Sequence, residues 1–305
     1  MTTAKFAVLM RHARRVVVLG VMLALVAVVI PDSGRQRFDA SLVKVDGVSG
    51  LDTDPGVVWI LALGSDARPG QPVLSSRADT IQLVGFNPRT GYATIIGVPR
   101  DSYVDIPGYG RNKINASMVY GGPQLMAESV ANAFGIAPDY VFTTSFWGFS
   151  RMVWTMGGVR VWSQHSFAER LAKIHRGWNQ LNGVEALVFV RQRHQLPGGD
   201  FDRSRNQGRF LIDGLRRALT VTQDPGALER LLYTFVGQTD IDIGPVELYR
   251  LSRGVLRIDP SKVKQCVIGG TTGYAGGASV VYPNLSQAHD IARRAGRDGR
   301  LEGGC

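Results

Sequence analysis

The sequence lacks most of the patterns that mark familiar catalytic and binding sites. It has no G-x-S-x-G nucleophile motif, no H-E-x-x-H zinc motif, no C-x-x-C pair and no Walker phosphate loop. It also has no long run of lysine or arginine, no zinc-finger spacing and no aromatic RNA-binding motif. The chain is nevertheless basic, with a net charge of +10. These absences make nucleic acid the weaker choice of partner and favour other polyanions, such as anionic membranes and phosphorylated polymers.

Cysteine is also scarce, and histidine forms no cluster in the sequence. The two cysteines are Cys266 and Cys305. In a reducing compartment both thiols would be incidental, whereas in an oxidising one they could form a bridge between the last predicted strand and the C-terminus. Of the scattered histidines, only His194, beside Arg193, lies next to a residue of the candidate site described below. The sequence leaves the cysteine state open and gives no reason to expect histidine-based catalysis.

Charged and polar side chains are missing altogether from residues 16–30, which read VVVLGVMLALVAVVI. This run is shorter than the roughly 20 residues that span a bilayer, but flanking residues can extend it. A cleaved signal peptide is the alternative, and the absence of a small-x-small cleavage site after the run favours a retained signal anchor over 16–34. The arginines before it place residues 1–15 in the cytoplasm and the body outside. Residues 35–55 are expected to form a linker.

Beyond residue 55 the sequence alternates between strand-like and helix-like segments, which predicts an α/β fold. We expect one domain over 56–270, followed by a C-terminal tail over 271–305. Four tryptophans are expected in its hydrophobic core rather than in a sugar-binding platform: Trp147, Trp154, Trp162 and Trp178. Strands are predicted at 57–63, 80–86, 92–98, 140–144, 159–162 and 263–268, and helices at 124–134, 146–156, 182–193, 205–219, 225–236 and 245–256.

Acidic and basic side chains cluster where three of the predicted strands begin or end. Because ligands of α/β sheets bind at strand ends, these clusters could converge on one site. Two carboxylates beside three guanidinium groups would suit a divalent cation and a polyanion such as a pyrophosphate. The alternative is that each residue forms an ordinary surface ion pair. The two carboxylates are those of Asp66 and Asp79, the three guanidinium groups are those of Arg68, Arg77 and Arg100, and Asp101 follows Arg100.

Further cations follow these clusters along the chain. Arg191 and Arg193 come directly after an apolar helical run at 186–190, so a rigid element would carry them. Lys113 follows a loop rich in proline and glycine and would act as a point charge. Like charges about 4 Å apart repel by roughly 4 kcal/mol at an effective dielectric of 20. A cluster of these cations therefore needs a bound anion. The alternative for any one of these residues is a solvated basic face, which needs no anion.

A last polar segment surrounds the start of a predicted helix. Arg203 and Gln207 are spaced so that they share one helical face, which could point at the same site. Asp200 or Asp202 could cap that helix.

Taken in order, these segments resemble the LytR-CpsA-Psr proteins of Gram-positive bacterial envelopes. The resemblance runs from about residue 58 to residue 219 and fades beyond it. Each segment alone is a weak signal, but nine in the family's order behind one N-terminal anchor are specific. The segments are Leu63-Gly64-Ser65-Asp66-Ala67-Arg68, Arg77-Ala78-Asp79-Thr80-Ile81, Val98-Pro99-Arg100-Asp101-Ser102-Tyr103-Val104, Lys113-Ile114-Asn115-Ala116, Gly121-Gly122, Gly157-Gly158-Val159, Leu181-Asn182-Gly183-Val184-Glu185-Ala186-Leu187, Arg191-Gln192-Arg193 and Asp200-Phe201-Asp202-Arg203.

The resemblance implies a mixed α/β/α sheet domain with a hydrophobic pocket for a polyprenyl chain. It also implies a magnesium-dependent phosphotransferase that moves a glycopolymer from an undecaprenyl- or decaprenyl-type pyrophosphate carrier onto peptidoglycan. In this pattern Asp66 and Asp79 are the metal-side carboxylates, and Asp101 orients an arginine or serves as a base. Many members carry arginine where this chain has Asn206, so no role is carried over to that position. The implied pyrophosphate ligands are Arg68, Arg77, Arg100, Lys113, Arg191, Arg193, Arg203 and Gln207, with Arg100, Asp101, Arg191 and Arg193 as the catalytic set.

Other functions are compatible with parts of this pattern. A non-catalytic envelope scaffold that binds polyprenyl phosphates would use the same arginines with weak metal dependence. A pyrophosphatase side activity, with water replacing the sugar hydroxyl, is compatible with transfer. A transcription regulator is disfavoured, because no helix-turn-helix signature is present and an exported body cannot reach DNA. The sequence does not distinguish teichoic acid, arabinogalactan and capsular polysaccharide as the polymer, nor does it indicate an oligomeric state.

Overall fold

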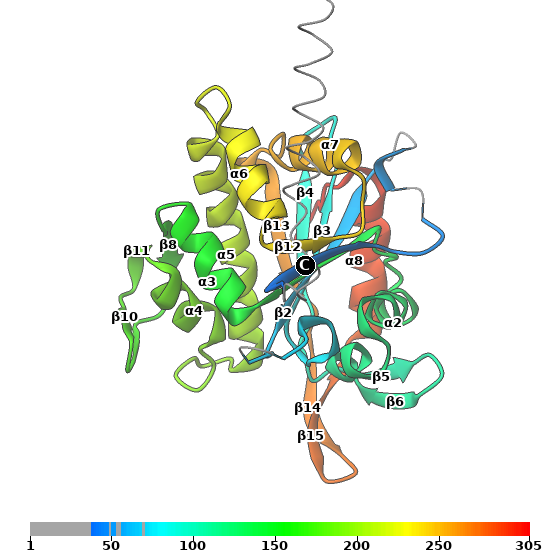
Figure 1. The fold of residues 1–305 in the computed structure, drawn as a ribbon. Coiled ribbons are helices and arrows are strands. Elements are labelled where there is room, and N and C mark those ends of the chain that lie inside the picture. The colour runs from blue at the N-terminus through cyan, green and yellow to red at the C-terminus, as the bar shows by residue number, and fades with distance from the viewer. Residues whose placement is uncertain (1–37, 49, 53–55, 69–70) are drawn as a thin grey trace, which may run out of the picture. The chain divides into compact units, whose positions relative to one another are not determined.

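A computed structural model describes residues 38–305 except 49, 53–55 and 69–70. A mixed β-sheet lies at the centre of the fold of these residues (Figure 1). In spatial order, its strands within these residues are β12 (Thr239–Ile241), β1 (Ala40–Lys44), β7 (Tyr140–Ser145), β2 (Val58–Ser65), β3 (Ala78–Phe86), β4 (Ala93–Gly97) and β13 (Val263–Val267). The pairs β1–β12, β2–β7 and β4–β13 are parallel, and the other neighbours are antiparallel. The mixed central sheet expected from the sequence is therefore confirmed.

The β3–β4 hairpin forms where the sequence places turn residues between two apolar runs. The side-chain oxygen Oδ1 of Asn87 accepts hydrogen bonds from the backbone N–H groups of Arg89, at 2.9 Å, and Thr90, at 3.1 Å. Gly91 then adopts a φ of +73°, which favours glycine. Most residues of the two flanking strands are buried, on both faces of the sheet, as in central strands of a covered sheet. The strands predicted at 80–86 and 92–98 are therefore confirmed, and they pair as a hairpin.

Helices cover both faces of the sheet (Figure 1). α2 (Ser117–Phe134) and α8 (Leu285–Asp298) share a hydrophobic cluster with β2, β3 and β4 on one face. α2 is kinked at Gly121 and Gly122, just before the position where the sequence predicts a helix to begin. The elements on the other side are α3 (Phe146–Thr155), α4 (Gly183–Arg191), α5 (Asp200–Val221), α6 (Ala227–Val236) and α7 (Pro245–Val255).

Short elements complete the described part of the chain. Most of them were not expected from the sequence, because hairpin strands of three to six residues with polar outer faces give a weak periodic signal. Four antiparallel pairs form: β5 (Tyr103–Ile106) with β6 (Gly110–Lys113), β8 (Val159–Ser163) with β11 (Gly177–Leu181), β9 (Phe167–Glu169) with β10 (Ala172–Ile174), and β14 (Gly270–Ala275) with β15 (Ala278–Pro283). The β8–β11 pair is a long hairpin whose connection contains the β9–β10 hairpin. The 3₁₀ turns are Gly50–Asp52, Val73–Ser75, Ile114–Ala116 and Pro260–Lys262.

The folded body extends beyond both boundaries that the sequence suggested. Part of the expected linker over 35–55 forms β1, whose Ala40 and Leu42 are buried in the sheet. The expected tail over 271–305 forms the β14–β15 hairpin and α8, whose Ile291 is fully buried. The signal was weak because α8 is mostly polar, with only a narrow apolar stripe.

The expected cytoplasmic segment over 1–15 and the expected signal anchor over 16–34 lie outside the described residues. Among the residues that are described, no helix combines the length and the apolar character needed to cross a bilayer.

A disulfide joins Cys266 and Cys305, which decides between the two cysteine states that the sequence left open. Cys266 is buried in β13, at an edge of the central sheet, and Cys305 is the last residue of the chain. The side-chain amide of Gln287 in α8 donates a hydrogen bond to the carbonyl oxygen of Cys305 at 3.2 Å. The C-terminus is therefore tied both to the sheet and to the helix that covers it.

The four tryptophans predicted in the core lie on the surface instead. Trp147 and Trp154 lie on α3, Trp162 on β8 and Trp178 on β11, and each side chain is 42–52% exposed. Trp147 and Trp154 form a T-shaped pair with ring centroids 5.7 Å apart, and Trp162 and Trp178 form another with centroids 5.5 Å apart. The prediction was wrong because these side chains occupy the outward positions of elements whose alternate positions fill the core. Trp59, on β2, is the buried tryptophan among the described residues.

Candidate functional site

A β-bulge places the first two candidate carboxylates. The pairing of β2 and β3 shifts between Gly64 and Ser65, which leaves Asp79 without a partner in the ladder. Bulges redirect side chains and are common next to active sites. The backbone N–H of Asp66 donates to the carbonyl oxygen of Arg77 at 3.1 Å, so Asp66 lies beside the start of β3. The two carboxylates predicted to face a metal therefore come from adjoining strand ends.

Four half-buried side chains then form a chain of alternating charge. Nη1 of Arg100, which follows β4, forms an ion pair with Oδ1 of Asp79. Nε of Arg100 lies 3.9 Å from Oδ2 of Asp101, and Nζ of Lys113 lies 2.9 Å from Oδ1 of Asp101. Burial alone would lower the pKa of Arg100, but attraction and a hydrogen bond to Asp79, together with the charge of Asp101, raise it. Two of the strand-end clusters therefore meet, and Lys113 joins them.

Arg203 brings the start of α5 into the same cluster. It is only 5% exposed, and its Nη2 lies 2.6 Å from Oδ1 of Asp200. Burial lowers the pKa of Arg203, and repulsion by Arg100 and Arg193 acts in the same direction against the attraction of Asp200 and Asp79. The charges of Arg100, Arg193, Asp79 and Asp200 therefore all act on Arg203. A concentration of buried positive charge of this kind would be stabilised by a bound anion.

Gln207 holds this part of α5 in place. It is 5% exposed, and its side-chain N–H donates to the carbonyl oxygen of Val190 in α4 at 3.0 Å. Its Oε1 accepts a hydrogen bond from Nε2 of Gln82 in β3 at 3.3 Å. Gln207, predicted as a pyrophosphate ligand, therefore already joins three elements of the protein one helical turn after Arg203.

The two arginines at the end of α4 lie in different surroundings. Oε1 of Gln192 accepts the backbone N–H of Arg193 at 2.9 Å and closes the turn after the helix. Arg193 is half-buried and close enough to Arg203 to affect its pKa. Arg191 is exposed, and its guanidinium lies over the ring of Phe146, 4.5 Å from the centroid. Arg193 therefore joins the charged cluster, whereas Arg191 lies at the beginning of α3.

The structure does not join all predicted ligands to the cluster. Asp66, Arg68 and Arg77 are exposed, and none of them forms a side-chain ion pair within the described residues. The backbone N–H of Arg68 donates to Oε1 of Gln71 at 3.0 Å, which orders the loop without fixing the guanidinium.

An unusually close contact sets the position of α5 against β4. A Cβ added to Gly97 would lie 2.2 Å from Oγ of Ser204, the residue after Arg203. We predict that Gly97→Ala lowers the free energy of unfolding by about 1–3 kcal/mol, as overpacking does, and that Ser204→Ala restores part of the loss. Urea denaturation of the single and double variants measures both effects. A single variant as stable as the wild type would contradict the prediction.

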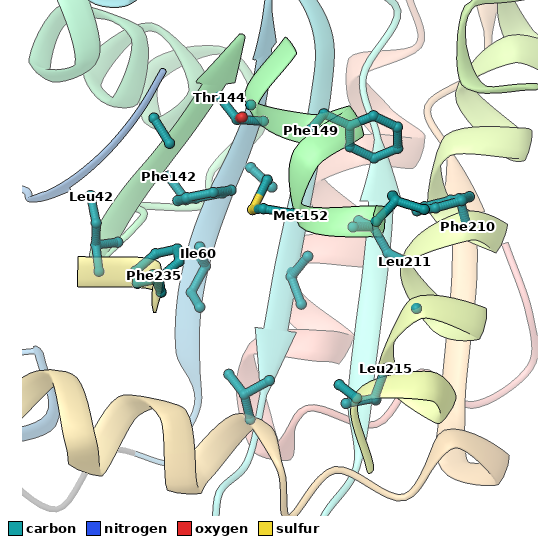
Figure 2. A pocket seen from close by; sticks show the side chains of 18 of the residues that line it. Leu42, Ile60, Phe142, Thr144, Phe149, Met152, Phe210, Leu211, Leu215 and Phe235 are labelled. Atoms are coloured by element: carbon teal, nitrogen blue, oxygen red, sulfur yellow. The ribbon is translucent and has the colours of Figure 1, made fainter. Parts of the chain in front are cut away.

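An apolar pocket of about 530 Å³ lies between the sheet and helices α3, α4, α5, α6 and α7 (Figure 2). Aromatic pairs line it: the rings of Phe142 and Phe235 are 5.8 Å apart, and those of Phe149 and Phe210 are 5.1 Å apart. Aliphatic side chains, one methionine and one threonine complete the lining that Figure 2 labels, namely Leu42, Ile60, Met152, Leu211, Leu215 and Thr144.

The pocket and the charged residues share a boundary. Gln207, one helical turn after Arg203, lines the pocket. Phe146 also lines it and lies under the guanidinium of Arg191. An amphipathic ligand could therefore place an apolar tail in the pocket and an anionic head on the arginines.

The carboxylates present fit a magnesium ion held jointly with a substrate. Magnesium usually takes one or two carboxylates plus phosphate oxygens. Asp66 is exposed and Asp79 is half-buried, so solvent reaches both. Within the described part of the chain, no three Asp, Glu, His or Cys side chains gather as a potential metal site. Phosphate oxygens would have to complete the ligand set.

The role of Asp200 in the charged cluster was not predicted from the sequence. The sequence suggested that Asp200 or Asp202 caps the helix, but Gly199 occupies that position without a side-chain cap. α5 begins at Asp200 rather than near residue 205, so Asp200 and Arg203 lie one turn apart and form an ion pair. An acidic residue three positions before an arginine was the available signal.

Comparisons with known proteins agree with this geometry. The family model described as the LytR_cpsA_psr family matches residues 34–295, which extends well past residue 219, where the resemblance was expected to fade. A probable cell wall biosynthesis protein, LcpB of Corynebacterium glutamicum, is 32% identical over 235 residues, which cover 72% of this chain and 54% of LcpB. A polyisoprenyl-teichoic acid–peptidoglycan teichoic acid transferase, TagU of Bacillus licheniformis, is 35% identical over 157 residues, covering 51% of this chain and 50% of TagU. The chain thus spans about half the length of these relatives.

Solved structures share the fold. The structure of YwtF (TagT) with bound octaprenyl pyrophosphate lipid superposes with a TM-score of 0.62 at 21% identity, covering 86% of this chain and 97% of that chain. Because the family model covers most of the sequence and the fold agrees, the chain belongs to the LytR-CpsA-Psr family.

Proposed function

We propose that this protein transfers a glycopolymer from a polyprenyl pyrophosphate carrier to peptidoglycan in the cell envelope. The observation that carries the proposal is the shared boundary of the apolar pocket and the arginine cluster, where Gln207 and Phe146 line the pocket beside Arg203 and Arg191. A polyprenyl pyrophosphate has the matching division into a long apolar chain and a compact anionic head. The names of two relatives support this reading, one being a teichoic acid transferase and the other a protein with bound octaprenyl pyrophosphate.

The donor would lie with its polyprenyl chain in the pocket and its pyrophosphate on the cluster. Arg100, Arg193 and Arg203 would neutralise the phosphate oxygens, and Arg203 would enter with its orientation already fixed by Asp200. Arg191, Arg68 and Arg77 would add to the positive field from more exposed positions. Magnesium, when bound by Asp66 and Asp79, would neutralise further charge on the pyrophosphate.

In the transfer step, a sugar hydroxyl of peptidoglycan attacks the sugar-proximal phosphorus. A new P–O bond forms to the acceptor, the P–O bond to the lipid phosphate breaks, and the lipid phosphate leaves with the bonding electron pair. The hydroxyl proton passes to a base or to solvent. Asp101 and Asp79 are the candidate bases, although each faces a cation in the resting geometry. Such a step depends on positioning and electrostatics, so no catalytic triad is needed.

The two leading functions can be separated by one assay. Purified full-length protein is incubated with a defined lipid-pyrophosphate-linked oligosaccharide and peptidoglycan fragments, with magnesium or with a chelator. We expect product only with magnesium. Donor binding without product, independent of magnesium, would contradict transfer and support the alternative of a polyprenyl-phosphate-binding scaffold. Release of phosphorylated lipid without acceptor would reveal a pyrophosphatase side activity. Offering donors with different sugars identifies the polymer.

Filling the pocket should reduce donor affinity according to the length of the lipid. Leu211 lies on α5 and lines the pocket, so Leu211→Trp removes space for the chain. Each methylene displaced from the pocket is worth about 0.8 kcal/mol, or a factor of about four in affinity. The Kd for a long-chain polyprenyl pyrophosphate should therefore rise, while that of a short-chain analogue stays constant.

Val246→Trp is the control for this substitution, because Val246 lies on α7 with 65% of its surface exposed. Equal affinity of wild type and Leu211→Trp for the long-chain lipid would show that the chain binds elsewhere.

A further inference from the structure

The β8–β11 hairpin has one face of buried aliphatic side chains and one face that exposes two tryptophans. Val159, Val161 and Leu181 point inward and are fully buried in a hydrophobic cluster. The alternating side chains of the two strands point outward, and Trp162 lies directly opposite Trp178 in the ladder. The outward face therefore presents a cross-strand tryptophan pair to solvent, 42% and 48% exposed.

This pair is built for a boundary between apolar and polar surroundings. The rings meet edge to face, with centroids 5.5 Å apart, and the guanidinium of Arg160 lies 4.9 Å above the ring of Trp178. Within the described part of the chain, neither indole N–H donates a hydrogen bond to the protein. An indole with a free N–H and an apolar ring favours the interfacial layer of a bilayer, where its polar edge meets headgroups.

The neighbouring β9–β10 hairpin adds an aliphatic tip. Leu171 lies in its turn and is 68% exposed, with Arg170 before it and Lys173 two positions later. Over residues 159–181 the chain carries four basic side chains, Arg160, Arg170, Lys173 and Arg176, against one acidic side chain, Glu169. An exposed leucine surrounded by cations is complementary to the acyl chains and anionic headgroups of a membrane.

We propose that the β8–β11 and β9–β10 hairpins form a docking surface for an anionic bilayer. Trp162 and Trp178 would lie at headgroup level, Leu171 would reach into the acyl region, and the basic side chains would contact lipid phosphates. A sugar platform is the competing use of exposed tryptophans. It fits less well, because the rings are perpendicular, one ring face is covered by Arg160, and an exposed leucine contributes little to sugar binding.

The position of this surface gives it a use. β8 packs against α5, and β10 packs against α4. Both helices contribute to the pocket, through Val190 of α4 and Phe210 of α5. Docking through these hairpins would keep the apolar pocket close to the membrane that holds long-chain lipids. Docking through this surface does not require the transfer activity, so binding to bilayers and transfer can be tested separately.

Tryptophan fluorescence in bilayers tests the proposal directly, because residues 1–37 contain no tryptophan and therefore contribute no signal. The full-length protein is reconstituted with phosphatidylglycerol bilayers whose acyl chains carry bromine, a quencher that acts at short range. We expect quenching and a blue shift of the emission relative to unbrominated bilayers. Trp162→Phe with Trp178→Phe should abolish most of the quenching, whereas Trp147→Phe with Trp154→Phe, a matched exposed pair, should leave most of it.

Charge is tested with a second variant. Each basic residue near an anionic surface contributes about fivefold in affinity, so Arg170→Glu with Lys173→Glu should release the surface and remove the quenching, as should phosphatidylcholine bilayers. All substituted residues are exposed, and unchanged circular dichroism would verify folding. Emission that brominated lipid leaves unchanged would overturn the proposal. So would quenching that survives the Trp162–Trp178 substitutions, or protection of that pair by soluble peptidoglycan oligosaccharides without any effect of lipid.

Discussion

Replacing Arg100 by alanine should reduce transfer by about 10³-fold or more, the scale seen when an arginine that stabilises phosphoryl-transfer charge is lost. Arg100 links the carboxylates of Asp79 and Asp101. Its removal leaves two anions without their shared cation at the place where the pyrophosphate would bind. The variant would then repel the substrate as well as fail to stabilise the leaving lipid phosphate.

Two further variants show whether the loss of transfer is specific to the guanidinium group of Arg100. Arg100→Lys keeps the charge but loses the planar fork, so its rate should lie between those of wild type and the alanine variant. Arg293→Ala removes an arginine that is 68% exposed on α8, and should leave the rate unchanged. The rate is measured with the lipid-linked donor and peptidoglycan acceptor, and thermal denaturation reports on the fold. Full transfer activity in a folded Arg100→Ala variant would contradict the role of Arg100 in the transfer step.

Loss of the disulfide should be the largest single effect on stability. Cys266 and Cys305 are 39 residues apart, and closing a loop of this length in the unfolded chain corresponds to about 4 kcal/mol. Cys305→Ser should therefore lower the free energy of unfolding by about that amount in urea denaturation.

A reducing agent provides the matched control for this prediction. It should destabilise the wild type to the level of Cys305→Ser and have no effect on the variant, because that variant has no bridge to break. Equal stability of wild type and variant in non-reducing buffer would contradict the prediction. A bridge of this kind is expected to persist in an oxidising compartment, which agrees with the proposed position of the body outside the membrane.

Local signals in the sequence predicted most of the sheet and the helices near the site. The sequence predicts a helix from residue 182, and in the structure Asn182 and Glu185 form both reciprocal hydrogen bonds of a capping box at the start of α4. The clusters at the strand ends were predicted to converge, and the ion pair of Arg100 with Asp79 confirms this for two of them. These predictions succeeded because each depends on residues close together in the chain or on the general behaviour of strand ends.

What could not be predicted depends on contacts between distant segments. The family resemblance implies a hydrophobic pocket, but its lining comes from strands and helices spread from residue 39 to residue 263, so no local pattern indicates which residues form it. The contact of Gly97 with Ser204 is equally invisible in sequence. Trp162 and Trp178 were misplaced because apolar character alone does not say which face of a hairpin meets the core. Asp200 was assigned to a cap because the start of its helix was placed too late.

The position of β1 has a mechanical consequence. β1 lies inside the sheet, paired with β12 through three residues and with β7 through five. Tension applied along this strand through residue 38 would load those hydrogen bonds together in shear, rather than opening them one at a time from an edge. If the protein is held through its N-terminal end while it is bound to a stiff wall polymer, a pulling force would therefore not detach β1 first.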